Sequence, residues 1–184
     1  MEIFKKDING IMLFAPKIFK DERGFFLETF RKSLFEDLGL PEFVQHNHSR
    51  SRKGVLRGLH YQISNVQGKL VRCLRGEIYD VAVDLRTDSK TFGKSVGVFL
   101  NDKNHHQLWI PPGFAHGFLC LSDIADVNYL CTDFYNPKFE NGLIWNDSGL
   151  EIDWPKLELN ANYIISDKDK SYPTLSNQSK EKLF

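Results

Sequence analysis

The chain has 184 residues, of which 41% are hydrophobic and 15 are Phe, which is enough apolar material for the core of one domain of ordinary size. Lys plus Arg and Asp plus Glu both number 24, so the chain lacks the basic excess of a general nucleic-acid-binding protein, although a local basic cluster for a small phosphorylated ligand is allowed. No apolar run approaches the roughly 18 residues of a membrane span, and the N-terminus has no signal-peptide pattern. We therefore expect a cytoplasmic protein without a membrane segment.

Short apolar runs punctuated by Gly, Pro, Asn and Asp predict an all-β fold with eight or more strands. The clearest strand pattern is the alternation of Tyr79, Val81, Val83 and Leu85 with polar or small residues. In chain order we predict strands at 24–30, 70–74, 79–86, 95–100, 107–110, 118–121 and 127–135, with one helix at 32–38 that Gly39 ends.

The predicted domain spans 1–184, with a core over about 1–170 and a polar, loose tail over 171–184. Strands of this length and number are typical of a jelly-roll barrel, which can hold a ligand inside. The polar faces of the strands would then form a site, although for any single strand a solvated outer face is equally compatible with the pattern. The three cysteines form no CxxC pair and are interpreted as reduced core thiols: Cys73, Cys120 and Cys131.

A metal site is disfavoured by the residues that surround the HxH pair His46 and His48. Three basic side chains follow at 50–53, where a cation site would need a carboxylate. His105 and His106 are expected in a loop. No nucleophile elbow and no glycine-rich phosphate loop occurs, so a nucleotide would have to be held by side chains.

The segment 54–62, GVLRGLHYQ, is the first candidate for catalysis. In a regular strand Arg57 and His60 would face opposite ways, but the paired glycines permit a kink or bulge. A lone His in such a run is usually structural, whereas the company of Arg57, Gln62 and Lys69 favours a site. Histidine is the natural general base near neutral pH, and it would need a buried acceptor, which a distant Asp could supply.

Ten segments between about residues 20 and 170 match the motifs of one protein family and occur in that family's order. They are DERGFFLE at 21–28, QHNHS at 45–49, GVLRGLHYQ at 54–62, QGKLV at 67–71, DVAVDLR at 80–86, TFG at 91–93, QLWIP at 107–111, GFAHGF at 113–118, WND at 145–147 and SDKD at 166–169. As an ordered set they are highly specific, and by them the chain resembles the dTDP-4-dehydrorhamnose 3,5-epimerase family.

This resemblance implies a cupin-type double-stranded β-helix with one or few short helices, forming a homodimer that exchanges N-terminal strands. It implies an isomerase that inverts C3 and C5 of dTDP-4-dehydro-6-deoxy-D-glucose, giving dTDP-4-dehydro-L-rhamnose for dTDP-rhamnose biosynthesis. Protons next to the C4 ketone can leave as an enolate forms, so neither a metal nor a redox cofactor is implied.

By the resemblance, His60 is the base, Asp169 orients it, Tyr129 is the acid on the opposite face and Lys69 stabilises the C4 oxyanion. Without the resemblance, Tyr129 would be interpreted as a core tyrosine. Departures from the family pattern are Phe134 in place of a common Tyr and Pro112 in place of a frequent Glu. The substrate-binding positions implied are Arg23, Glu28, Gln45, His46, Asn47, Arg57, Lys69, His116, Tyr135, Glu140 and Lys168, with Arg57 and Lys168 near the diphosphate and Tyr135 stacked on thymine.

Four alternatives remain open from the sequence. A relative could invert only C3 or only C5, or act on another nucleotide-linked 4-keto sugar. A ketoisomerase of the same fold could move the keto group between C4 and C3. A sugar-nucleotide-binding cupin without activity would lack His60, Asp169 or Tyr129, and all three are present. A metal-dependent cupin oxygenase would contain stoichiometric iron or manganese.

Overall fold

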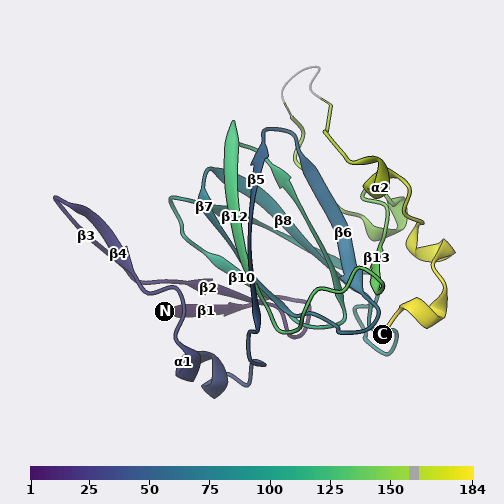
Figure 1. The fold of residues 1–184 in the computed structure, drawn as a ribbon, viewed down its shortest axis with the longest axis horizontal. Helices are drawn as coiled ribbons and strands as arrows, with labels where there is room; N and C mark the ends of the chain where they lie inside the picture. The colour runs from purple at the N-terminus through teal and green to yellow at the C-terminus, as the bar shows by residue number, and fades with distance from the viewer. Residues whose placement is uncertain (158–161) are drawn as a thin grey trace.

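The computed structural model describes residues 1–157 and 162–184. Two β-sheets pack face to face, and a β-hairpin forms a third sheet of two strands (Figure 1). The six-stranded sheet has the order β1-β2-β10-β7-β12-β5, and the five-stranded sheet has the order β13-β6-β11-β8-β9. Their strands are β1 Glu2–Lys5, β2 Met12–Ala15, β5 Gln45–Arg52, β6 Leu56–Gln62, β7 Lys69–Arg75, β8 Glu77–Asp84, β9 Ser95–Asn101, β10 Gln107–Ile110, β11 Phe114–Cys120, β12 Ile124–Cys131 and β13 Glu140–Gly142.

From β5 to β8, successive strands alternate between the two sheets, as in a cupin-type jelly roll. The main core lies between the sheets, and the predicted all-β cupin fold is confirmed. Strand β8 shows how the sequence builds it. Val81 and Val83 pack into a second apolar cluster, whereas Ala82 belongs to the core between the sheets. By the two-residue period of a strand, the polar face of β8 therefore points into the sandwich.

Several strand boundaries differ from the prediction. The strand predicted at 24–30 is β4 Gly24–Leu27, which pairs with β3 Ile18–Asp21, and it ends early because Phe30 packs against Phe35 with ring centroids 5.2 Å apart. The strand predicted at 118–121 begins at Phe114, and the one predicted at 127–135 is Ile124–Cys131. β11 is buried at every position, so its sequence carries no alternation that would mark its start.

The predicted helix is confirmed as α1 Lys32–Asp37, and Gly39 follows it with φ +74°. Phe35 of α1 packs in a third apolar cluster with Phe14 and Trp109 of the six-stranded sheet. The sequence prediction missed α2 Asp167–Lys170 and the short 3₁₀ segments Ser148–Leu150, Leu175–Asn177 and Lys180–Lys182. These segments are too short to show a helical apolar period.

Residues 171–184, predicted as a loose tail, are docked on the five-stranded sheet. The Phe184 ring lies 5.8 Å from that of Tyr61, and its backbone N–H donates to Leu85 O at 3.1 Å. Gln178 is buried and donates to the Tyr61 hydroxyl at 2.9 Å. A few apolar side chains thus anchor a polar segment, because the sheet face beneath them is itself apolar.

The β3–β4 hairpin projects away from the two packed sheets (Figure 1). It exposes Phe19, Phe25 and Phe26, which are 52%, 58% and 69% accessible. The three cysteines are buried and unbridged, as predicted. Among the described residues, no helix is long and apolar enough to cross a membrane.

Candidate active site

A cavity of about 530 Å³ opens between the two sheets. Ten of the predicted site residues line it, and they come from strands of both sheets and from the segment that follows β12. These ten are Gln45, His46, Asn47, Arg57, His60, Lys69, His116, Tyr129, Tyr135 and Glu140. The cavity also borders His48, Ser49, Tyr61, Gln62, Gln67, Gly117 and Phe118.

His60 on β6 is hydrogen-bonded to a buried carboxylate. Its Nε2 lies 2.7 Å from Asp169 Oδ1, and Asp169 Oδ2 accepts from the Gly58 N–H at 3.3 Å. Asp169 is placed by α2, whose first turn is capped by Ser166 Oγ. Burial raises the pKa of Asp169, but the hydrogen bond and charge of His60, together with hydrogen bonds to Gly58 and Ser166, outweigh it, so the net shift is downward. Asp169 is therefore an anion that orients the imidazole.

A break in register between β6 and β11 brings Arg57 and His60 to the same cavity. His116 pairs with His60, but Phe118 pairs with Arg57, so the single residue between them on β11 faces two residues on β6. At Gly58, with φ +125°, a Cβ would lie 2.5 Å from Gly117 Cα. The structure therefore contains the bulge that the glycines of this segment allowed, and the bulge requires glycine where Gly58 meets Gly117.

Tyr129 and Lys69 lie on the opposite wall. They belong to β12 and β7 of the six-stranded sheet, whereas His60 belongs to the five-stranded sheet. Burial raises the pKa of the Tyr129 hydroxyl, which keeps its proton on at neutral pH. Burial lowers the pKa of the Lys69 ammonium, opposed in part by Cys131 and Asp80. The cavity therefore has an imidazole on one wall and a phenolic hydroxyl and a lysine amine on the other.

A second histidine–aspartate pair lies beside the first. His116 on β11 is the cross-strand partner of His60, and its Nε2 lies 2.8 Å from Asp80 Oδ1. Both members of this pair are buried. The sequence prediction included His116 and missed Asp80, although Asp80 stands on the polar face of the most regular strand pattern in the chain.

The mouth of the cavity is built around Glu140 and Tyr135. The Tyr135 hydroxyl donates to Glu140 Oε2 at 2.8 Å, and the Lys168 ammonium lies 2.5 Å from the same oxygen. Gln45 Oε1 accepts from the Tyr135 backbone N–H at 2.8 Å. Lys168 thus reaches the edge of the site through Glu140, which joins the predicted binding residues of β5, β13 and α2.

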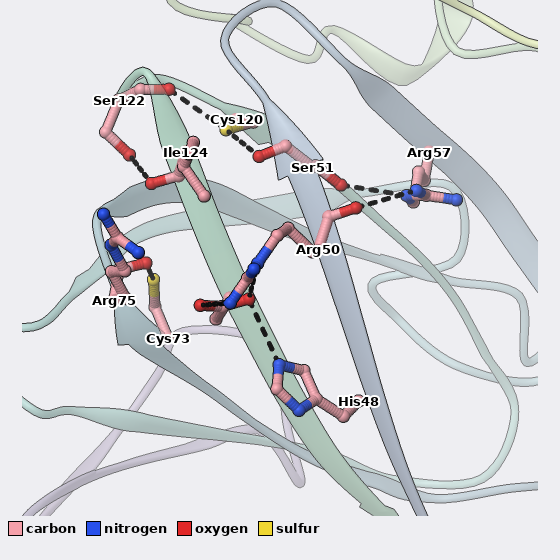
Figure 2. A network of polar contacts seen from close by, with 10 residues as sticks. His48, Arg50, Ser51, Arg57, Cys73, Arg75, Cys120, Ser122 and Ile124 are labelled. Atoms are coloured by element: carbon pink, nitrogen blue, oxygen red, sulfur yellow. Dashed lines mark hydrogen bonds and ion pairs between the residues drawn. The ribbon is translucent and has the colours of Figure 1, made fainter.

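Strand β5 supports the site from the side. The Arg57 guanidinium donates through Nε to Ser51 Oγ at 3.1 Å and through Nη2 to Arg50 O at 3.4 Å (Figure 2). His48 and Arg50 both contact the carboxylate of Asp126. His46 is hydrogen-bonded to Asn128 on β12.

Across residues 1–157 and 162–184, no three His, Cys, Asp or Glu side chains are grouped so that they could hold a metal ion.

Three predicted binding residues are not part of the cavity lining: Lys168 contacts the lining residue Glu140, whereas Arg23 and Glu28 lie elsewhere. Arg23 is in the hairpin turn and is paired with Asp21 at 2.5 Å, and Glu28 follows β4 and is paired with Arg31 at 2.8 Å. Both belong to the segment around the projecting hairpin (Figure 1). Within one chain, the structure does not bring them to the cavity.

Gln62 and Gln67 are further cavity residues that the prediction did not assign to the site. Gln62 accepts from the Asn136 N–H at 2.7 Å and donates to Asn65 O at 2.7 Å, and Gln67 donates to Asp133 O at 2.8 Å. They fix the loop that carries Tyr135. Both stand in segments that match the family, so their spacing beside His60 and Lys69 was the available indication.

The chain matches the family described as dTDP-4-dehydrorhamnose 3,5-epimerase over residues 5–177. It is 50% identical to the dTDP-4-dehydrorhamnose 3,5-epimerase of Escherichia coli K12 across the full length of both chains, and 53% identical to that of Shigella flexneri over 92% of this chain and 93% of the relative.

Solved structures give the same result. The structure is similar to that of dTDP-6-deoxy-D-glucose-3,5-epimerase from Legionella pneumophila Philadelphia 1 in complex with dTDP-4-keto-L-rhamnose. The TM-score is 0.95 at 49% identity, covering 99% of this chain and 96% of the other.

Proposed function

The chain belongs to the dTDP-4-dehydrorhamnose 3,5-epimerase family, and we propose that it inverts C3 and C5 of dTDP-4-dehydro-6-deoxy-D-glucose to give dTDP-4-dehydro-L-rhamnose. One observation carries the proposal. The His60–Asp169 pair lies on one sheet, and Tyr129 and Lys69 lie on the other, with the cavity between them. Inversion of a carbon needs a base and an acid on opposite faces of the sugar ring.

His60 takes the proton from the carbon next to the C4 ketone. When Nε2–H donates to Asp169 at 2.7 Å, Nδ1 carries the free lone pair that accepts this proton. The imidazolium that forms is balanced by the Asp169 carboxylate. The electron pair of the broken C–H bond moves into the enolate, so the charge develops on the C4 oxygen.

Lys69 stabilises this oxygen electrostatically, in a buried place where a fixed charge acts strongly. Tyr129 then delivers its hydroxyl proton to the opposite face of the same carbon, and the ketone reforms. Water restores the proton to Tyr129 and removes the one on His60. The sequence runs once at each carbon and consumes neither a metal nor a redox cofactor.

The other predicted site residues hold the nucleotide and the sugar. Arg57 and Lys168 supply cations for the diphosphate, and Tyr135 stacks on the thymine ring. Gln45, His46 and Asn47 reach the base or its sugar from β5, and His116 and Glu140 flank the hexose. The family match and the shared cavity support these assignments.

We also propose a homodimer in which the β3–β4 hairpin of one copy reaches the cavity of the other. Arg23 and Glu28 would then bind the partner's nucleotide, and the exposed Phe19, Phe25 and Phe26 would become buried. Their exposure and the projection of the hairpin support this arrangement (Figure 1). We place the enzyme in the cytoplasm, where nucleotide sugars are made.

Proton NMR of dTDP-4-dehydro-6-deoxy-D-glucose in D₂O, with EDTA-treated enzyme, tests the reaction. Deuterium is expected at both C3 and C5, in a product that a suitable reductase converts to dTDP-rhamnose. Exchange at one carbon alone would make the protein a mono-epimerase. Absence of exchange with the nucleotide still bound would refute the proposal and favour a ketoisomerase or another nucleotide sugar. Loss of exchange only after chelation would indicate a metal.

A further inference from the structure

Asp80 is a buried carboxylate for which the reaction described above has no use. It is 0% exposed on β8, and only one of its oxygens has a partner, since Oδ1 bonds His116 and Oδ2 has no hydrogen bond within the described chain. A buried carboxylate with a free oxygen is costly unless positive charge lies close by. Burial of the Asp80 side chain therefore costs free energy of folding. The side chain lies next to the cavity but does not itself line it.

Among the described residues, the buried Lys or Arg side chain is Lys69, which lines the cavity from the sheet that faces β8. The Lys69 ammonium is 8% exposed and lies in no ion pair of the described residues, and Asp80 is one of the two groups whose charge favours its protonated form. The titratable groups that line the cavity with Lys69 are His46, His48, Arg57, His60, Tyr61, His116, Tyr129, Tyr135 and Glu140; Cys131 is its strand partner, and β10 contributes none. Glu140 is engaged by Lys168 and Tyr135, and Asp169 is engaged by His60. Asp80 is therefore the carboxylate that remains for Lys69.

The bond to His116 has a second consequence. His116 Nε2 lies 2.8 Å from Asp80 Oδ1, which fixes the proton on Nε2 and leaves Nδ1 as an acceptor. His116 borders the cavity directly beside His60 on the neighbouring strand. A histidine held this way accepts a hydrogen bond from a sugar hydroxyl, and it cannot compete with His60 for the proton of the reacting carbon while that hydroxyl occupies it.

We propose that Asp80 is a positioning residue for the part of the site that binds the sugar. Asp80 keeps Lys69 protonated and facing the C4 oxygen, and it orients His116 to accept a hydrogen bond from a sugar hydroxyl. This inference rests on the proposed epimerase function. Asp80 touches no reacting atom, so it acts through these two neighbours. Asp169 orients the base His60, which lies on the same sheet as His116. Each carboxylate thus positions one histidine, and the two histidines have different roles.

The variant Asp80→Asn keeps the size of the side chain and removes its charge. At saturating substrate, C3 and C5 exchange should slow by about tenfold or more, short of the 10²–10³-fold typical of deleting an oxyanion donor outright. Without the Asp80 charge the pKa of Lys69 falls further, so the alkaline limb of the kcat profile should move to lower pH. Binding of dTDP, which lacks the hexose, should be unchanged.

The matched control is Asp84→Asn, on the same strand and equally buried, whose carboxylate bonds Arg86, Ser89 and Thr91 away from the cavity. It should lower the thermal unfolding temperature without moving the pH limb. In a Lys69→Gln background, Asp80→Asn should cause no further movement of the alkaline limb. A normal rate and pH profile for Asp80→Asn, or the same shift with Asp84→Asn, would overturn the inference.

If Asp80→Asn does not fold, ¹⁵N NMR of the histidine rings in the unaltered protein tests the inference through the tautomer of His116. His116, assigned by the signal lost in His116→Gln, should carry its proton on Nε2 and have an unprotonated Nδ1. The opposite tautomer would contradict the inference. A wild-type protein that exchanges neither C3 nor C5 would instead refute the proposed function, so the two failures are distinguishable.

Discussion

His60 and Asp169 are 109 residues apart in the chain, yet they are bonded at 2.7 Å. Replacing His60 by Gln removes the only proposed base, so deuterium exchange at C3 and C5 should fall by about 10²–10⁴-fold, the usual contribution of general-base catalysis. Calorimetric binding of dTDP should change little. His106→Gln, in the loop before β10, is the control and should remain active. Equal loss of binding and exchange would mark His60 as structural.

A variant at Tyr129 is expected to distinguish removal of the proton from inversion of the carbon. Tyr129→Phe keeps the ring in its partly buried place between the two sheets and removes the acid. His60 can still withdraw and return a proton on its own face, so exchange should persist while inversion slows by about 10²-fold or more. Following both by NMR in one D₂O sample gives the ratio. Full epimerase activity in this variant would rule out Tyr129 as the acid.

At this scale, local sequence gives only part of the site. The cluster of Arg57, His60 and Lys69 stands out within 13 residues of sequence, and histidine chemistry suggests a base. Asp169 could be assigned only through the family resemblance, because its pairing with β6 depends on the whole fold. Asp80 was overlooked because a charged residue on the polar face of a strand is normally solvated, and only the packing of the second sheet shows that this face is interior.

Among the elements, alternation identified the strands with one apolar face, such as β8 and β9. It failed for β5, whose sequence QHNHSRSR has no apolar side, and for β6, which two glycines interrupt. Both strands line the cavity, so their function replaces the apolar pattern with polar residues and glycine. The C-terminal segment was mispredicted for a related reason. Its few anchors, including Leu183 and Phe184, lie among polar residues.

Gln178 tests how much this segment holds the catalytic strand. Its amide donates to Tyr61 OH at 2.9 Å and to Asn141 Oδ1 and Gly142 O at 3.2 Å. Gln178→Ala removes this donor from the buried Tyr61 hydroxyl and Gly142 carbonyl, so the free energy of unfolding should fall by about 1–3 kcal/mol. Urea titration followed by Trp fluorescence measures it, with exposed Glu181→Ala as the control. An unchanged midpoint would show that the segment contributes little to the stability of the sheet.

For the whole molecule, the packing of the two sheets places the proposed base opposite the proposed acid. His60 comes from the five-stranded sheet and Tyr129 from the six-stranded sheet, so a sugar ring bound between the sheets would meet them on opposite faces. Arg23 and Glu28 lie outside this arrangement in one chain, since the hairpin that precedes Glu28 extends away from the sheets (Figure 1). A two-fold dimer would supply them to the partner's cavity.

A mixed dimer tests this. One copy carries Arg23→Ala and the other carries His60→Gln, each with its own affinity tag, and the dimer that holds both tags is purified after co-expression. If the hairpin serves the partner, one site has both native residues and the other has neither, so kcat/KM per dimer should be about half that of the unaltered dimer. If Arg23 serves its own chain, neither site is complete, and activity should stay at the level of the parent variants. Light scattering should give twice the 21.3 kDa chain mass. A mass of one chain would refute the dimer and leave Arg23 and Glu28 without a binding role.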